Sequence, residues 1–86
     1  MAYAYMLRCS DGSLYSGYTV DLQKRLQLHN SGRGAKYTRS RLPVTLVYFQ
    51  EFSSIHEALQ REAALKRLSR QEKLQLIAAQ NNKPED

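Results

Sequence analysis

The sequence predicts a small α/β domain: a three-stranded antiparallel sheet flanked by three helices, in the order β-β-α-β-α-α. Two runs rich in tyrosine and aliphatic residues, 3–9 and 14–19, are separated by a short turn sequence, which is typical of a β-hairpin. A third apolar run covers 44–52, and the other periodic segments begin at residues that cap helices. The 86 residues suffice for one domain, predicted over 1–80, and the polar residues 81–86 are expected to form a flexible tail.

The turn of this hairpin decides which side chains share a face of the sheet. If Ser10-Asp11-Gly12 forms a three-residue loop with Gly12 in the left-handed conformation, Leu7 pairs with Tyr15. Tyr5 and Tyr15 then lie on the same face. A two-residue loop would shift the pairing by one residue and place the two tyrosines on opposite faces. We predict the three-residue loop.

The middle of the chain is predicted to form a helix, an exposed loop and a strand. Asp21 is a good N-cap for a helix that runs to about His29, and Asn30-Ser31-Gly32 favours its end. Residues 32–42 mix glycine, hydroxyl and basic side chains, which is typical of an exposed loop. The following run, 44–52, predicts a strand that is buried on at least one face.

Two capping boxes, Ser54 with Glu57 and Ser69 with Glu72, predict the start of two further helices. The first of these helices carries Glu62 inside an apolar stripe formed by Ile55, Ala58, Leu59, Leu65 and Leu68. A carboxylate that faces a core is costly unless it is paired or binds a metal. Glu62 is therefore a candidate metal ligand, and the alternatives are a salt bridge to a basic neighbour or a position at the rim of the stripe.

The charge of the chain favours a polyanionic partner. Thirteen Lys and Arg against eight Asp and Glu give a net charge of +5, which points to nucleic acid or an anionic membrane surface. Leu22 to Gln50 contains no acidic residue, and its basic side chains are Lys24, Arg25, Arg33, Lys36, Arg39 and Arg41. A segment with charges of one sign builds an electrostatic field rather than a set of local ion pairs.

The cysteine content and the N-terminus indicate a compartment. Cys9 is the one cysteine, so the chain forms no internal disulfide, and its two histidines have no cysteine partners with which to build a structural zinc site. The first residues lack the pattern of a signal peptide, and no apolar stretch is long enough to span a membrane. We therefore expect a cytoplasmic protein without a membrane partner.

Arg25 and His29 are the first candidates for chemistry, because a spacing of four places them on one side of a helix. Together they can bracket a phosphate, with the guanidinium stabilising charge and the imidazole donating or positioning a proton. The alternative is a solvated Arg beside a half-buried His. The six tyrosines are candidate bases only where a neighbouring cation lowers the pKa of the phenol from about 10.

These residues together resemble a known family. Tyr3-Ala4-Tyr5 and Tyr15-Ser16-Gly17 resemble the paired Gly-Ile-Tyr and Tyr-Ile-Gly elements of GIY-YIG endonucleases. Arg25, His29 and Glu62 stand where that family carries its catalytic Arg, its His or Tyr, and its metal-binding Glu. The resemblance covers nearly the whole chain, and five residues in order at these spacings form a specific motif.

Two shorter segments resemble particular branches of the family. Residues 34–39 resemble a loop of small single-domain bacterial members, and residues 25–30 are similar to the catalytic subunit of structure-selective endonucleases that cut branched DNA. The resemblance therefore implies a metal-dependent endonuclease that hydrolyses phosphodiester bonds in nucleic acid, DNA in the first instance.

The resemblance also implies a role for each residue. Glu62 would hold one divalent ion, Mg²⁺ with Mn²⁺ as the alternative, against the leaving 3′ oxygen. Tyr5 would be the general base beside Tyr15, although these two roles could be exchanged. Arg25 would clamp the phosphate oxygens, and His29 would position the nucleophile or the base. The residues expected to contact flanking phosphates are Lys24, Arg33, Lys36, Arg39 and Arg41.

Two features depart from the family pattern and keep other functions open. Tyr3-Ala4 replaces the usual Gly-Ile, and no Asn follows the helix of Glu62 in the region of Leu74. The alternative function is a DNA- or RNA-binding module that has kept the fold and lost the chemistry. A third is a basic interaction protein whose last helix docks a partner, and a separate targeting protein is a further expected partner.

Overall fold

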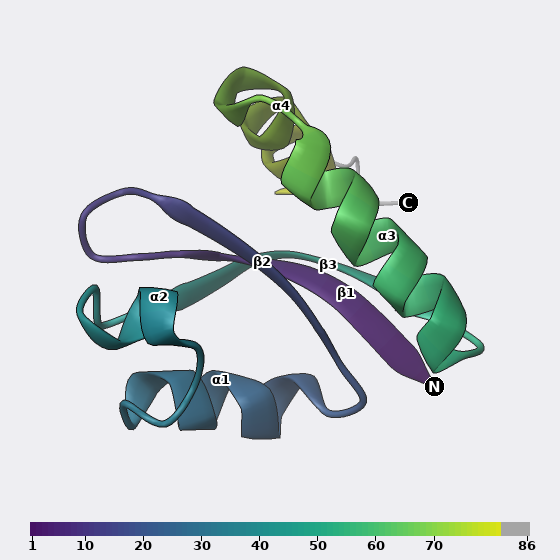
Figure 1. Cartoon of the computed structure of the whole chain (residues 1–86). Helices are drawn as coiled ribbons and strands as arrows, with labels where there is room; N and C mark the ends of the chain where they lie inside the picture. The colour runs from purple at the N-terminus through teal and green to yellow at the C-terminus, as the bar shows by residue number, and fades with distance from the viewer. Residues whose placement is uncertain (82–86) are drawn as a thin grey trace.

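The computed structural model describes residues 1–81 and shows the predicted order of elements with one addition (Figure 1). The strands are β1 (Ala2–Arg8), β2 (Leu14–Thr19) and β3 (Thr45–Phe52), and the helices are α1 (Leu22–Asn30), α2 (Lys36–Arg39), α3 (Ile55–Arg67) and α4 (Arg70–Asn81). The predicted fold class is confirmed. Among the helices within residues 1–81, none is long and apolar enough to cross a membrane.

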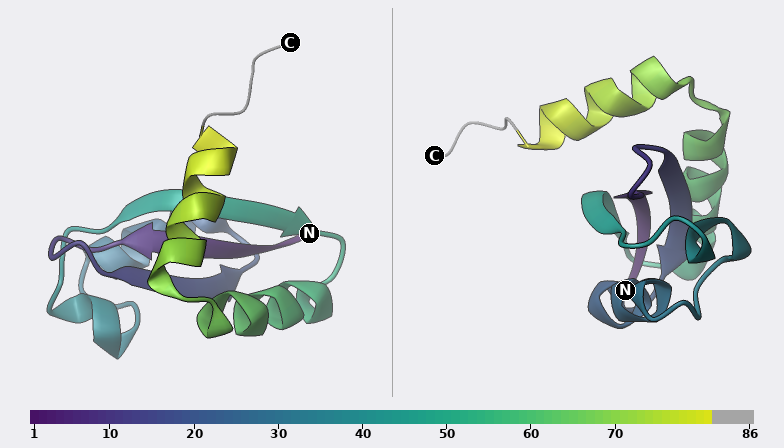
Figure 2. Two further views of the ribbon diagram at one scale, coloured as in Figure 1. Left: turned by 90° about the horizontal axis from the view of Figure 1, so that it is seen from above. Right: turned by 90° about the vertical axis from the view of Figure 1, so that its left-hand side faces the viewer.

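The sheet is antiparallel with strand order β2-β1-β3, so β1 is central and is covered on both faces. Because side chains alternate along a strand, Tyr5 and Leu7 pack in one cluster with leucines of α1, whereas Ala4 and Met6 pack in a second cluster with Leu65 of α3. Figures 1 and 2 show α1 along one face of the sheet, with α3 and α4 on the other. Each face of β1 therefore contributes to its own core.

The hairpin between β1 and β2 has the predicted three-residue loop. The N–H of Cys9 donates to the carbonyl of Ser13 at 2.9 Å, and Gly12 has a φ of +85°. Leu7 lies opposite Tyr15, so the predicted register is confirmed. Tyr5 and Tyr15 share the face covered by α1.

The helix starts also follow the sequence signals. Asp21 accepts a hydrogen bond from the N–H of Lys24 at 3.1 Å, which caps α1 as predicted. Ser69 and Glu72 form a reciprocal capping box, in which the Ser69 N–H donates to the Glu72 carboxylate and the Glu72 N–H donates to the Ser69 hydroxyl. These local contacts explain why the predicted starts agree with the observed ones.

The segment 32–42 is largely exposed, as the composition indicated, but it is not all loop. It contains α2, in which Thr38 is fully buried beneath exposed basic side chains. Burial of this residue depends on contact between α2 and α1, and the sequence carries no local periodicity that announces such a contact. The correction matters because Thr38 belongs to the candidate site.

Gln80, the last residue of the predicted domain, is tied to the sheet. The side-chain amide of Gln80 accepts from the Phe49 N–H at 3.1 Å and donates to the Phe49 carbonyl at 2.7 Å. It thereby pairs backbone groups on the free edge of β3. Asn81 closes α4, and the rest of the predicted tail, 82–86, lies outside the described residues.

The apolar stripe predicted for α3 is narrower in the structure. Ala58 and Leu65 are buried, but Ile55 is 48% exposed and Leu59 is 37% exposed. β3 is likewise less buried than its apolar run indicated, with Phe49 44% exposed, because β3 is an edge strand. Within residues 1–81, no element covers these side chains fully.

Candidate active site

The centre of the candidate site is a buried pair formed by Tyr5 on β1 and His29 on α1. The hydroxyl of Tyr5 lies 3.0 Å from Nε2 of His29, and the two residues are 2% and 0% exposed. On its other side, Nδ1 of His29 lies 2.9 Å from Oγ1 of Thr38. The Thr38 hydroxyl lies 2.9 Å from the carbonyl of Ala35, to which it donates. Four groups thus form one hydrogen-bonded chain.

The direction of the hydrogen bonds in this chain follows from counting protons. A carbonyl oxygen can only accept, so the one hydroxyl proton of Thr38 points to Ala35. Thr38 must then accept from Nδ1 of His29, which places the proton of the neutral imidazole on Nδ1. Nε2 is left as an acceptor, and the hydroxyl of Tyr5 donates to it. Thr38 therefore sets the tautomer that makes His29 a base toward Tyr5.

The electrostatics of the pair agree with this arrangement. Burial, with the positive charge of Arg25 as a second cause, lowers the pKa of His29 to about 4, so the imidazole is neutral at pH 7. Burial raises the pKa of Tyr5, and Arg25 offsets only part of that rise. The neighbouring cation that the sequence analysis required of a candidate base is present, but burial outweighs its effect on the pKa of Tyr5. Its phenol keeps the proton and has a neutral base beside it.

Arg25 and Tyr15 complete what we call the Tyr5 cluster, which consists of Tyr5, Tyr15, Arg25 and His29. Nε of Arg25 donates to the Tyr5 hydroxyl at 3.4 Å, and this hydrogen bond is the largest contribution to the raised pKa of the guanidinium. The ring of Tyr15 meets the ring of His29 edge-on, with centroids 5.4 Å apart. Arg25 and His29 lie on one side of α1, as their spacing predicts, and both contact the Tyr5 hydroxyl.

Two glycines make room for the cluster. A Cβ atom built at Gly17 would overlap the hydroxyl and ring of Tyr5, and one built at Gly34 would overlap the ring and backbone of His29. Both positions therefore require the smallest residue because of close approach to a side chain. Gly17 belongs to the tyrosine-containing motif, and Gly34 and Thr38 belong to the segment 34–39 that resembles a family loop. That resemblance did not indicate their contacts with His29, which depend on how α2 packs against α1.

Glu62 reaches the site from a different direction. α3 packs on the sheet face opposite the Tyr5 cluster, and the Glu62 side chain is 16% exposed and lies 3.5 Å from the ammonium of Lys66. The structure thus shows the salt bridge and the position at the stripe's rim that were the alternatives for this residue. Its charge still contributes to the raised pKa of Tyr5, so the carboxylate lies within electrostatic range of the cluster.

A divalent cation would find one protein carboxylate here. Within residues 1–81, no three side chains of His, Cys, Asp or Glu gather closely enough to form a multi-residue metal site. Mg²⁺ commonly keeps several waters and binds one or two carboxylates together with substrate phosphates, so Glu62 fits such an ion as its single protein ligand.

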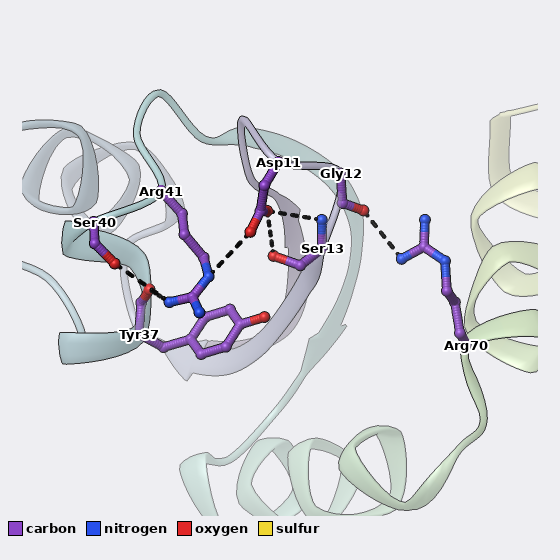
Figure 3. Close-up of polar contacts among 7 residues, drawn as sticks. All are labelled: Asp11, Gly12, Ser13, Tyr37, Ser40, Arg41 and Arg70. Atoms are coloured by element: carbon purple, nitrogen blue, oxygen red, sulfur yellow. Dashed lines mark hydrogen bonds and ion pairs between the residues drawn. The ribbon is translucent and has the colours of Figure 1, made fainter.

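The predicted phosphate-contacting residues fall into two groups. Lys24, Arg33, Lys36 and Arg39 are exposed. Arg41 is engaged within the protein: its Nε lies 3.1 Å from the Asp11 carboxylate, and its guanidinium carbon lies 3.9 Å from the centre of the Tyr37 ring (Figure 3). It also donates to the Tyr37 carbonyl at 2.7 Å. Arg41 therefore joins the hairpin to α2 in this structure.

Comparisons with known proteins agree with the motif and the fold. A family model described as the GIY-YIG catalytic domain matches residues 1–75. A UPF0213 protein of Streptococcus agalactiae serotype V is 54% identical over 81 residues, which cover 94% of this chain and 92% of that protein. A UPF0213 protein of Clostridium perfringens is 52% identical over 86 residues, covering 100% of this chain and 92% of that protein.

Solved structures show the same similarity. The solution NMR structure of a UPF0213 protein from Bacillus halodurans has a TM-score of 0.61 and 46% identity, and the match covers 96% of this chain and 89% of that one. A second NMR structure, of a protein from E. faecalis, has a TM-score of 0.58 and 40% identity, covering 98% and 91%.

Proposed function

This chain belongs to the GIY-YIG catalytic-domain family, as a relative of bacterial UPF0213 proteins, and on that premise we propose that it hydrolyses phosphodiester bonds in nucleic acid with a divalent cation. The observation that carries the proposal is the Tyr5 hydroxyl, held between Nε2 of His29 at 3.0 Å and Nε of Arg25 at 3.4 Å. The neutral imidazole can accept a proton from the phenol, and the guanidinium can stabilise negative charge on a nearby phosphate. Proton transfer during phosphodiester hydrolysis needs both groups.

The proton path follows from the tautomer of His29. As water attacks the phosphorus, its proton passes to the Tyr5 oxygen while the Tyr5 proton passes to Nε2 of His29. The new P–O bond forms in line with the breaking bond to the 3′ oxygen, which leaves and takes a proton from solvent. Thr38 accepts from Nδ1 throughout, so the imidazolium that forms remains hydrogen-bonded on both sides.

Arg25 and Glu62 would stabilise the charge that develops. The guanidinium of Arg25 lies beside Tyr5, where it can hold the non-bridging oxygens of the same phosphate. Glu62 would hold the cation, Mg²⁺ or Mn²⁺, which when bound neutralises charge on the leaving oxygen. Lys66 then needs no other acidic partner, because its side chain is 55% exposed and its ammonium can be solvated.

Affinity for the substrate would come from the exposed basic residues of α1 and the segment around α2. Lys24, Arg33, Lys36 and Arg39 can contact phosphates, and Arg41 would act indirectly by holding Tyr37. Such contacts do not discriminate between bases. DNA is the substrate that we propose first, on the basis of the family.

The test is a cleavage assay on end-labelled duplexes, flaps, junctions and single strands, with Mg²⁺, with Mn²⁺ and with chelator. We expect cation-dependent nicking, and Tyr5→Phe should lower the single-turnover rate by roughly 10²- to 10⁴-fold, the usual contribution of general acid–base catalysis. Tyr18→Phe is the matched control, because Tyr18 lies on β2 and is exposed. Equal cleavage by the Tyr5 and Tyr18 variants would refute the assignment.

One observation favours the alternative of a binding module without activity. Glu62, the one carboxylate assigned to the cation, is paired with Lys66. If the wild-type protein binds the panel of nucleic acids but cleaves none of them with either cation, the binding module is the correct function.

A further inference from the structure

A groove runs along the free edge of β2, next to the Tyr5 cluster. We call it the edge groove. It has a volume of about 240 Å³, and its lining residues are Leu14, Tyr15, Ser16, Tyr37, Lys66 and Lys73. β2 is an edge strand, so the groove opens where the sheet ends and joins residues near α2 to residues of α3 and α4. Tyr15 belongs to both the edge groove and the Tyr5 cluster.

The edge groove is electropositive. Lys66 and Lys73 line it, and Glu62 lies 3.5 Å from Lys66. A second hollow of about 200 Å³ continues from Leu14 and Lys73 to Ser13 and Arg70. Arg70 donates to the carbonyl of Gly12 at 3.0 Å, which holds its guanidinium at the hairpin (Figure 3). The carboxylates next to these cations are Glu62, paired with Lys66, and Asp11, which accepts from Ser13 and is paired with Arg41. Lys73 and Arg70 are in addition to those two pairs, so the groove favours an anion.

Ser16 supplies an independent sign of a ligand. Ser16 lines the edge groove and is 4% exposed. Its hydroxyl has no hydrogen-bond partner among the described residues. A buried hydroxyl without a partner is unfavourable, because it has lost its hydrogen bonds to water and forms none within the protein. An acceptor oxygen in the groove would satisfy it. A phosphate oxygen fits both this donor and the two ammonium groups.

The aromatic side chains of the groove indicate which part of a nucleic acid enters it. One face of the Tyr37 ring is stacked on Tyr15, with centroids 6.0 Å apart, and the Arg41 guanidinium lies over the ring at 3.9 Å. Tyr37 is still 40% exposed, but contacts with Tyr15 and Arg41 reduce the ring surface that is open to a stacking base. The two lysines and the Ser16 hydroxyl make a phosphate the group that the groove suits best.

From these observations we propose that the edge groove binds an internal phosphodiester of the strand whose neighbouring phosphate lies at the Tyr5 cluster. Ser16 would donate to a non-bridging oxygen, and Lys66 and Lys73 would neutralise its charge. The inference rests on the proposed function, because it assumes that the Tyr5 cluster faces nucleic acid. It adds a second phosphate contact beside Tyr15. The two contacts together set the path of the nucleic-acid strand across β2.

The experiment measures binding by fluorescence anisotropy, in chelator, to a labelled oligonucleotide over a series of salt concentrations. Lys73→Gln should weaken binding about threefold to sixfold near 0.1 M salt and make the slope of log K against log salt shallower by about 0.7 to 0.9, the value for one phosphate contact. Ser16→Ala should weaken binding without changing the slope, because the lost donor is uncharged. Arg67→Gln is the matched control, since Arg67 is exposed on α3 and does not line the groove.

Each other outcome has a defined meaning. Equal effects of the Lys73 and Arg67 variants would show that only total charge matters and would overturn the inference. Oligonucleotides with and without a terminal phosphate should compete equally, and a requirement for the terminal group would contradict the assignment to an internal phosphodiester. If the wild-type protein binds no oligonucleotide, the proposed function fails. Wild-type binding that is indifferent to Lys73→Gln and Ser16→Ala refutes the edge groove alone.

Discussion

The hydroxyl of Tyr5 and Nε2 of His29 lie 3.0 Å apart, although the two residues come from the central strand and from α1. Both are buried, so the phenol proton has a base within the protein. The pair works only while Nε2 is unprotonated. Thr38, nine residues after His29, enforces this condition through Nδ1.

The first prediction concerns Thr38. Thr38→Val keeps the shape of the side chain but removes the acceptor for Nδ1, so His29 should lose its preference for the Nδ1–H tautomer and the cleavage rate should fall. Thr38→Ser keeps the hydroxyl, so it should retain both the Nδ1–H tautomer of His29 and the cleavage rate. The tautomer is measured by long-range ¹H–¹⁵N NMR of the imidazole. An Nε2–H tautomer in the wild-type protein would contradict the proton count.

The second prediction is the pH dependence of stability. The pKa of His29 is about 4 in the folded protein and 6.5 in its ordinary state, so the unfolded chain takes up a proton between these pH values while the folded protein does not. The stabilising contribution is complete above pH 6.5 and is lost as the pH falls toward 4, at a total of about 3 kcal/mol. Urea unfolding at pH 7.5 and 4.5 measures most of this loss. His29→Gln should show a smaller difference, and an equal one would refute the claim.

The third prediction concerns Gly17. Gly17→Ala places a Cβ against the hydroxyl of Tyr5 and should lower the free energy of unfolding by about 1–3 kcal/mol, as overpacked cores do. Tyr5→Phe removes the nearest atom, so the double variant should lose less stability than the sum of the single variants. A double-mutant cycle by urea unfolding gives the coupling. Strict additivity would mean that the two residues do not press on one another.

The fourth prediction separates the roles of Glu62. Its partner Lys66 is 55% exposed, so Glu62→Gln should change stability by less than about 0.5 kcal/mol, as for surface pairs spaced by four. The larger loss expected of a buried cation does not apply here. Cation-dependent cleavage should nevertheless disappear, whereas the exposed control Glu51→Gln should keep it. Full activity of the Glu62 variant would remove it from the site.

The fifth prediction tests the exposed cations of α2. Replacing Lys36 and Arg39 with Gln should weaken binding and make its salt dependence shallower, while cleavage at saturating substrate should persist. Asp11→Asn is the comparison: it removes no cation, and it weakens the contacts of this carboxylate with Arg41 and Ser13. Binding that does not respond to salt would exclude the electrostatic account.

Local features of the sequence determined the register of the hairpin and the starts of the helices. The hairpin loop around Gly12 set the register of Tyr5 and Tyr15, and Asp21, Ser54 and Ser69 marked the helix starts. Each of these depends on residues within a few positions, because a turn or a cap is completed by its own neighbours. The spacing of Arg25 and His29 is local in the same sense.

Only the tertiary structure decided the chemistry of those residues. Burial of His29, its bond to Thr38, the partner of Glu62 and the engagement of Arg41 all depend on which elements pack together. A pKa is set by desolvation and by charges brought close in space, and neither can be read from neighbouring letters. The sequence therefore identified the candidate reactive groups. Packing determined which of these groups keep a proton, which can bind phosphate and which are already paired with another side chain.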